Sequence, residues 1–252
     1  MARHDHDASG PAEVLAGKSE LREKVWAAMT APGINRFPGP TNRIPNFVGA
    51  ERAAERLRAT EVWQRATTLK TNPDSPQLPV RQRALEDGKR VYMAVPRLAE
   101  PEPFFLLDPT DLNDTPRRSA SIKGAAKSAQ RVAVTALRPV DLVVTGCVAV
   151  SEDGARLGKG GGFSDLEYAL AYEAGLIGPE TRVVTTVHEA QIVSAGAIPV
   201  VPHDVYLDLI VTEERVIECS RPHRAAGRIR WDELSEQKIA AIPLLRGRRH
   251  SD

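Results

Sequence analysis

Residues 156–165 read RLGKGGGFSD and form a glycine-rich loop between an apolar segment and an amphipathic one. Glycine lets the backbone take positive φ angles and brings its N–H groups close to a ligand. Where such a loop leads into a helix, those N–H groups and the helix dipole favour an anion. The segment therefore predicts a strand, a loop and a helix around a polyphosphate site, with a surface turn before a helix as the alternative.

The charged residues of the loop make this prediction more specific. Arg156 and Lys159 add positive charge, and Asp165 is suited to hold a divalent metal on bound phosphates. The loop is not a Walker A motif, because no Gly-Lys-Ser/Thr follows the glycines. It also departs from the dinucleotide fingerprint, since Phe163 stands at the third glycine position. These features indicate Mg-ATP and argue against a P-loop NTPase or an NAD enzyme.

Composition limits the other classes of function. The formal net charge is +1, so no overall field favours nucleic acid. Cys147 and Cys219 lie in apolar segments without metal-ligand spacing, and both are predicted to be buried, reduced thiols. No apolar run approaches the ~20 residues of a membrane span. The polar residues 1–10 contain no apolar signal core, and we expect a cytoplasmic, monomeric protein without a membrane or nucleic-acid partner.

Apolar segments alternate with amphipathic ones, which predicts an α/β fold with a largely parallel sheet covered by helices. Residues 141–150 are almost wholly apolar, as in a central strand covered on both faces. Other expected strands span 90–95 and 182–187 with a continuation at 192–195, and a hairpin joins 207–211 to 215–219. Helices are expected from residue 18, over 50–67, over 80–87 and over 166–174.

The domain organisation follows from the same pattern. We expect a disordered lead at 1–17, a single domain over 18–245 and a basic tail at 246–252. The tail reads RGRRHSD and is predicted to be solvated, with an RNA or phosphate contact as the alternative.

Three motifs resemble those of a known family. The loop at 156–165 is similar to R-L-G-x-G-x-G-Y-Y-D, residues 18–22 (KSELR) to K-x-x-L-R, and residues 203–213 (HDVYLDLIVTE) to a closing H-D-x-x-x-D strand. In this order they resemble the 5-formyltetrahydrofolate cyclo-ligases, or methenyltetrahydrofolate synthetases. The stretches NRIPNF at 42–47, DLEYA at 165–169, VHEAQ at 187–191 and IPLLR at 242–246 are similar to the branch of methenyltetrahydrofolate synthetase domain-containing proteins.

The resemblance implies a Rossmann-like three-layer sandwich and an ATP- and Mg²⁺-dependent reaction. In this reaction ATP phosphorylates the formyl oxygen of 5-formyltetrahydrofolate, N10 attacks the activated carbon, and phosphate leaves as 5,10-methenyltetrahydrofolate forms. Such a reaction needs positioning and charge neutralisation rather than a nucleophilic side chain. Some members of the branch carry an RNA-recognition module, and the sequence of this chain contains no signature of one.

The phosphate half of the expected site matches the family. Lys18 and Arg22 are four residues apart, so one helical face presents both to the phosphates, unless they form a solvated first turn. Arg156 and Lys159 would neutralise the transferring phosphoryl group. Asp165 is the expected metal ligand, with a helix N-cap as the alternative. Asp208 either assists the metal or pairs with a nearby cation. The expected nucleotide-binding residues of the loop are Gly158, Gly160, Gly161, Gly162 and Phe163.

The folate half departs from the family. Phe163 and Ser164 replace its paired tyrosines, and Pro76-Gln77 stands where the family has a folate-contacting acid, with Asp74 the nearest carboxylate. Phe47 is expected to stack on a flat ring of the ligand, unless its loop covers the core. Phe47, Asp74 and Phe163 are therefore the predicted folate contacts. The alternatives to a cyclo-ligase are a non-catalytic nucleotide- or folate-binding sensor or scaffold and, less favoured, an RNA-associated protein.

Overall fold

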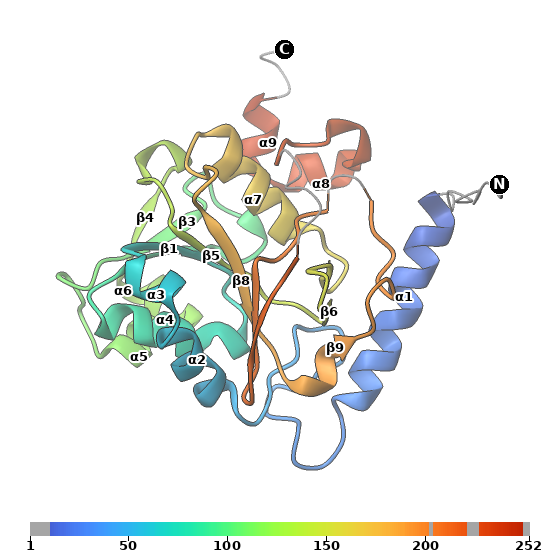
Figure 1. Cartoon of the computed structure of the whole chain (residues 1–252). Coiled ribbons are helices and arrows are strands. Elements are labelled where there is room, and N and C mark those ends of the chain that lie inside the picture. Colours follow the sequence, from blue (N-terminus) through green and yellow to red (C-terminus); the bar gives the residue numbers. More distant parts are fainter. Residues whose placement is uncertain (1–10, 202–203, 221–226, 249–252) are drawn as a thin grey trace.

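The computed structural model describes residues 11–201, 204–220 and 227–248. A central sheet of eight strands lies between two layers of helices (Figure 1), which confirms the predicted three-layer α/β fold. The strand order is β11-β10-β8-β5-β1-β2-β3-β4. The five strands in the middle are parallel, whereas β11, β3 and β4 are antiparallel to their neighbours. The strands of this sheet are β1 (Thr68–Thr71), β2 (Arg90–Ala94), β3 (Phe104–Leu107), β4 (Gln130–Val132), β5 (Leu142–Val144), β8 (Arg182–Thr186), β10 (Leu209–Val211) and β11 (Val216–Glu218).

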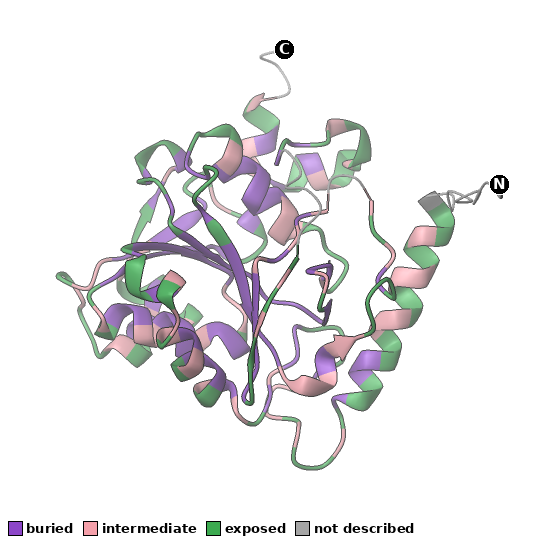
Figure 2. Cartoon of the chain, in the orientation of Figure 1, coloured by how far each residue is buried: buried purple, intermediate pink, exposed green. Residues whose placement is uncertain are grey.

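Helices cover both faces of the parallel strands, and β5 and β10 are accordingly wholly apolar. In β5, Val143 packs in the same core cluster as Tyr168 of the helix α7, whereas Val144 belongs to the cluster on the other face, with Leu57 and Val80. The same alternation occurs in β8 and β10. Figure 2 shows these strands buried, apart from the start of β8, where Arg182 is exposed.

One face carries the helices between α2 and α6, and the other carries α7 with α8 and α9 (Figure 1). The helix α4 (Leu78–Glu86) ends at its cap Asp87, and the next residue, Gly88, has a positive φ of 73° that terminates the helix. The helices are α1 (Pro11–Ala28), α2 (Ala50–Arg58), α3 (Glu61–Arg65), α4 (Leu78–Glu86), α5 (Pro116–Ser119), α6 (Ile122–Ser128), α7 (Phe163–Glu173), α8 (Glu236–Ala241) and α9 (Pro243–Arg248).

A second sheet lies beside the first, in the order β7-β6-β9. Its strands are β6 (Ala149–Ser151), β7 (Arg156–Leu157) and β9 (Ile192–Val193). The helix α1 packs against this small sheet through a core cluster that includes Trp26, Met29, Ala149 and Leu157. The small sheet therefore holds the start of the glycine loop next to α1.

Four expectations about the chain need correction. Residues 141–150 form two strands in different sheets, since the chain leaves the main sheet after Val144. The segment at 192–193 pairs with β6 and does not continue β8. The first helix begins at Pro11, so residues 11–17 do not belong to a disordered lead, and α9 continues to Arg248. The remaining residues of the expected lead and tail, 1–10 and 249–252, lie outside the described residues.

The two cysteines differ. Both are free, and Cys147 is buried as predicted, but Cys219 is only half-buried. Burial raises the pKa of the Cys219 thiol to about 12, so the thiol stays protonated at neutral pH.

Candidate active site

The order of the parallel strands creates a topological switch point at the carboxyl ends of β1 and β5, and we refer to the region around Asn72 and Gly146 as the crevice. The chain leaves β1 toward β2 on one side and later returns to β5 on the other, and ligands bind at such a switch point in α/β sheets. Asn72 follows β1, and its side-chain oxygen accepts a hydrogen bond of 3.0 Å from the backbone N–H of Gly146, which follows β5. The two strand ends are thus joined at the floor of the crevice.

The glycine loop adopts backbone angles that side chains would disfavour. Gly160 has φ of 101°, and Gly162, the N-cap of α7, has φ of 62°. Arg156 at the start of the loop is buried, and its Nε donates to the carbonyl of Val205 at 2.9 Å. A guanidinium nitrogen of Arg156 also forms an ion pair with Asp165 in the first turn of α7. Arg156 therefore fixes both ends of the loop.

Two side chains of α1 reach the same region. Arg22 donates from Nε to the carbonyl of Gly158 at 2.7 Å, and burial lowers the pKa of its guanidinium. Lys18 forms an ion pair of 2.7 Å with Asp204. The spacing of four residues on one helical face thus brings both cations to the glycine-loop region, as predicted.

A turn after β1 faces the loop across the crevice. Lys159 of the loop forms an ion pair of 3.2 Å with Asp74 in this turn. A Cβ atom at Gly146 would lie 3.0 Å from Oε1 of Gln77 and 3.1 Å from Oδ2 of Asp74, so a larger residue here would displace these side chains by a few tenths of an ångström. Gln77 is fully buried, and its Nε2 donates to the carbonyl of Thr186 at 3.2 Å, whereas its Oε1 has no hydrogen-bond partner.

A buried polar network supports the crevice from below. Glu167 of α7 forms a buried ion pair with Lys70 of β1 and accepts a hydrogen bond of 2.6 Å from Nδ2 of Asn72. Burial raises the pKa of Glu167, and the ammonium of Lys70 opposes this rise. Ser164 donates to Oδ1 of Asn72 at 3.2 Å and lies 2.8 Å from the hydroxyl of Thr145. This network connects α7 with the ends of β1 and β5.

The turn itself is held by Arg81 of α4. This guanidinium is buried, and it donates to the carbonyls of Asn72 at 2.6 Å, of Asp74 at 3.2 Å and of Pro73 at 3.3 Å. A fourth hydrogen bond of 2.9 Å goes to Ala120. Burial lowers the pKa of Arg81 to about 10, and the group stays charged at neutral pH.

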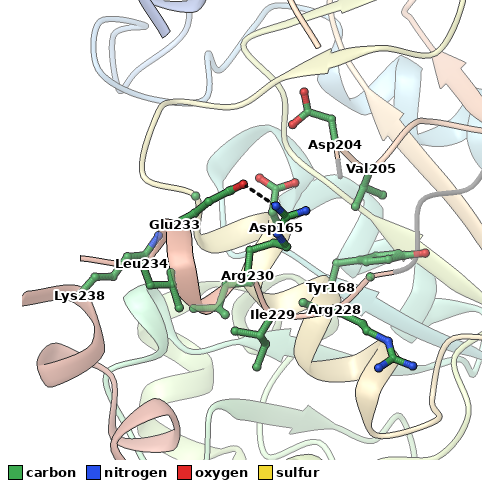
Figure 3. A pocket seen from close by; sticks show the side chains of 14 residues that line it. Asp165, Tyr168, Asp204, Val205, Arg228, Ile229, Arg230, Glu233, Leu234 and Lys238 are labelled. Carbon is green, nitrogen blue, oxygen red and sulfur yellow. Dashed lines mark ion pairs between the residues drawn. The ribbon is translucent and has the colours of Figure 1, made fainter. Parts of the chain in front are cut away.

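A cavity of about 200 Å³ opens beside the loop, at the amino-terminal end of α7. Figure 3 shows side chains of opposite charge around it, with Asp165 and Asp204 on one side and Lys238 on another. Arg228 and Arg230 complete its charged lining, together with Glu233. The cavity thus combines three carboxylates with three cations next to a glycine loop, a composition suited to a metal-bound polyphosphate.

Comparison with known proteins matches this architecture to one family. The profile of the 5-formyltetrahydrofolate cyclo-ligase family matches residues 15–213. The chain belongs to this family. The methenyltetrahydrofolate synthase domain-containing protein of Bos taurus is 38% identical over 239 residues, which cover 93% of this chain. The human protein of the same name is 36% identical over 243 residues and 95% of this chain. The family suggested by the sequence motifs is confirmed, and these relatives carry the name of the branch that the motifs resemble.

The chain spans 62% of the length of the bovine relative and 63% of the human one. A solved structure of the 5,10-methenyltetrahydrofolate synthetase of Aquifex aeolicus superimposes with a TM-score of 0.51 at 20% identity, covering 80% of this chain and 92% of that chain. This structural likeness supports the fold. Membership of the cyclo-ligase family supports a folate-related ligase activity.

Two residues expected in the cyclo-ligase site lie elsewhere. Phe47 is fully buried, with its ring edge-on to His188 at 5.9 Å, so its loop covers the core and the ring is not available to stack on a ligand. Asp208 lies where β8 and β10 begin, and it accepts a hydrogen bond of 2.6 Å from the N–H of Val183 and pairs with Arg182 at 3.3 Å. Asp208 is therefore at the opposite end of the sheet from the crevice. Of the two roles expected of it, pairing with a nearby cation is confirmed, and it does not join Asp165.

Asp204 takes the place expected of Asp208. It is the first aspartate of the H-D-x-x-x-D motif, and it lines the same cavity as Asp165. The motif contained both aspartates, but only the three-dimensional arrangement shows which one turns toward the loop. Phe163 is half-buried, and its ring lies 5.0 Å from the ammonium of Lys238. Lys238 had no signal in the motifs.

Two kinds of feature were not found in the described part of the chain. Within residues 11–201, 204–220 and 227–248, no three His, Cys, Asp or Glu side chains gather as a metal cluster. No helix among the same residues is long and apolar enough to cross a membrane.

Proposed function

We propose that this protein is an ATP- and Mg²⁺-dependent ligase that converts 5-formyltetrahydrofolate to 5,10-methenyltetrahydrofolate. The observation that carries the proposal is the ion pair of 3.2 Å between Lys159 and Asp74. It spans the gap between the glycine loop and the turn after β1, so the expected phosphate and folate halves face each other within the reach of one lysine side chain. A group transferred from nucleotide to folate needs such a juxtaposition.

The residues of the loop have distinct roles in this proposal. Lys159 is flexible and 45% exposed, and it leaves Asp74 to contact the γ-phosphoryl group during its transfer to the formyl oxygen. Arg156 is buried and paired, so it orients the loop and Asp165 and contributes positive charge from beneath. Lys18 and Arg22 add cations from α1, and the backbone of Gly158 and Gly160–Gly162 with Phe163 lines the nucleotide.

The side chains present fit a bound Mg²⁺. Asp165 is 43% exposed and Asp204 18% exposed at the same cavity, and Mg²⁺ typically takes one or two carboxylates plus phosphate oxygens and water. When bound, the metal would neutralise charge on the phosphates. Asp165 and Asp204 would hold it, while the ion pairs with Arg156 and Lys18 orient the two carboxylates.

The folate half of the site is the crevice above Gly146. Asp74 and the buried, unpartnered Oε1 of Gln77 both point over this glycine, so they offer acceptors to N–H groups of a pterin ring. Ser164 adds a hydroxyl in place of an aromatic ring. The crevice therefore recognises a flat, nitrogen-rich ligand mainly through hydrogen bonds.

A non-catalytic nucleotide- or folate-binding protein is the second candidate. The observation that favours it is the amide of Gln77 at the crevice, where the family has an acid. An amide accepts hydrogen bonds but carries no negative charge, and it would bind a cationic or protonated folate less strongly than a carboxylate.

The first test mixes purified protein with 5-formyltetrahydrofolate and Mg-ATP and follows the absorbance of methenyltetrahydrofolate. We expect an increase that depends on ATP, and we expect Lys159→Ala to lose most of the rate because it removes a charge that acts in the transition state. Lys24→Ala is the matched control, since Lys24 is also paired with a carboxylate but is 69% exposed on α1.

The outcomes separate the two candidates. A flat trace from folded protein that binds ATP or folate would reject the ligase and support the binding protein. Equal rates for Lys159→Ala and Lys24→Ala would remove Lys159 from the site even if the protein is active.

A further inference from the structure

The cavity beside the glycine loop has a wall outside the region that the family profile covers. The match ends at residue 213, whereas residues Gly227, Arg228, Ile229, Arg230, Glu233, Leu234 and Lys238 line the cavity. We infer that this wall, residues 227–238, is part of the nucleotide site, and that Lys238 binds the phosphates of ATP there. The inference rests on the proposed function and adds to it a residue outside the family motifs.

Lys238 is positioned directly over the glycine loop. Its ammonium donates a hydrogen bond of 2.8 Å to the carbonyl of Gly161. A Cβ atom at Gly162 would lie 2.9 Å from the same nitrogen, so the glycine makes room for it. The ring of Phe163 lies 5.0 Å away and provides a cation–π contact. An ammonium group has three donors, and the hydrogen bond to Gly161 uses one of them.

The wall is held firmly against α7. Ile239, the neighbour of Lys238, is buried in a cluster with Leu166 and Leu170 of α7. The backbone N–H of Ile229 donates to Glu173 at 2.9 Å. At the other end of the wall, a Cβ atom at Gly227 would lie 2.5 Å from the ring of Tyr168, so the backbone packs on α7 too closely for any larger residue. The backbone that carries Lys238 is therefore held in place by its packing on α7.

The charges around the cavity favour a metal-bound polyphosphate over a simple anion. Three carboxylates and three cations, Lys238 among them, line the cavity, and a ligand that carried only negative charge would be repelled by the carboxylates. Burial lowers the pKa of Lys238, while Asp165 opposes this effect. A phosphate chain with Mg²⁺ would satisfy both kinds of charge, since the carboxylates would hold the metal and the lysine would bind phosphate oxygens.

The test compares the binding of Mg-ATP and of inorganic tripolyphosphate with Mg²⁺ by calorimetry. Lys238→Met keeps the length and apolar stem of the side chain but removes its charge. We expect it to weaken both ligands by a similar factor of about tenfold or more, because it removes a charged hydrogen bond. Lys238→Arg should keep most of the affinity, and Lys127→Met removes an exposed lysine of α6 as the matched control.

Each result has a clear meaning. Unchanged Mg-ATP affinity in Lys238→Met would overturn the inference, and so would a loss that affects ATP but spares tripolyphosphate. If Lys238→Met fails to fold, Lys238→Gln keeps a donor for the Gly161 carbonyl without the charge and is expected to show the same loss. Failure of the unaltered protein to bind Mg-ATP would reject the proposed function itself, and the inference with it.

Discussion

The two ends of the central sheet each carry a cavity, and the larger one is not the candidate site. At the start of β8 and β10, a cavity of about 500 Å³ is lined by Arg182, Asp208 and Cys219 among others. Beside the glycine loop, near the end of β5, the cavity measures about 200 Å³. Both cavities contain acids and bases, so neither cavity size nor the presence of charged residues identifies the candidate site.

The difference lies in what the carboxylates hold. At the amino ends, Asp141 accepts hydrogen bonds from the backbone N–H groups of Thr67 at 2.8 Å and Thr68 at 3.0 Å, and Asp208 accepts one from Val183. These acids tie strands together. Beside the loop, Asp165 forms an ion pair with Arg156, and Asp204 forms one with Lys18 and accepts a single backbone hydrogen bond of 3.0 Å. Side-chain pairs can exchange for a ligand, whereas backbone contacts belong to the fold.

The largest expected effect comes from the same substitution made at each end. Asp165→Asn should lower kcat/KM for ring closure by about 100-fold or more, because losing a metal-binding charge removes several kcal/mol of transition-state stabilisation. Asp208→Asn should leave kcat/KM within about twofold and act on stability only. Steady-state kinetics of both variants, with thermal unfolding as a control for folding, provides the measurement. Equal losses in the two variants would break the distinction between the ends of the sheet.

The second effect concerns the buried ion pair beneath the crevice. Lys70→Met leaves the carboxylate of Glu167 buried without its cation, and we expect a loss of about 3–5 kcal/mol in the free energy of unfolding. Lys70→Met combined with Glu167→Leu should recover part of this loss, since no buried charge remains. Urea denaturation of the single and double variants measures both values.

The pH dependence of the Lys70→Met variant sharpens this test. Burial raises the pKa of Glu167 in the folded state, and removal of Lys70 raises it further. A carboxyl group with a raised pKa binds its proton more tightly in the folded than in the unfolded state, so its contribution favours folding at low pH and is lost as the pH rises. The deficit of Lys70→Met should therefore be smaller at pH 5 than at pH 8. A constant deficit would show that packing, rather than charge, holds this position.

The smallest effect is expected at the amino end of β2. The hydrogen bond from Arg90 lowers the pKa of Asp108 to about 2, with further hydrogen bonds from Thr110. A lowered pKa stabilises the fold above the ordinary value of 3.8, and this contribution is lost as the pH falls toward 2. Asp108→Asn should cost up to about 1 kcal/mol at pH 7, less below pH 3, and nothing in kcat/KM. A loss of activity in Asp108→Asn would mean that the amino end takes part in function.

Much of the fold followed from local patterns. Apolar runs at 90–95 and 182–187 became parallel strands, and the pair at 207–219 became the hairpin of β10 and β11. The prediction of one strand over residues 141–150 was wrong, because an apolar run does not indicate where a chain passes from one sheet to another. The turn occurs at Thr145–Gly146, where the backbone N–H of Gly146 bonds to Asn72, a residue 74 positions away.

The candidate site shows the same limit. Lys18, Arg22 and the glycine loop could be linked by motif and helical spacing, and the structure brings them together. Whether Asp204 or Asp208 lies at the cavity depends on the path of the chain into β10. The burial of Phe47 depends on tertiary packing. Lys238 joins the site through contacts across 77 residues with Gly161, which no local pattern reveals.

The guanidinium of Arg81 has a consequence for how tightly the crevice can bind. By holding three consecutive carbonyls, it makes the turn at 72–74 rigid before any ligand arrives. The conformational entropy of that turn is lost when the protein folds, so a bound ring meets acceptors already in place and association carries a smaller entropic penalty. A buried arginine thereby contributes to affinity, because the entropic cost of ordering the turn is part of folding and not of binding.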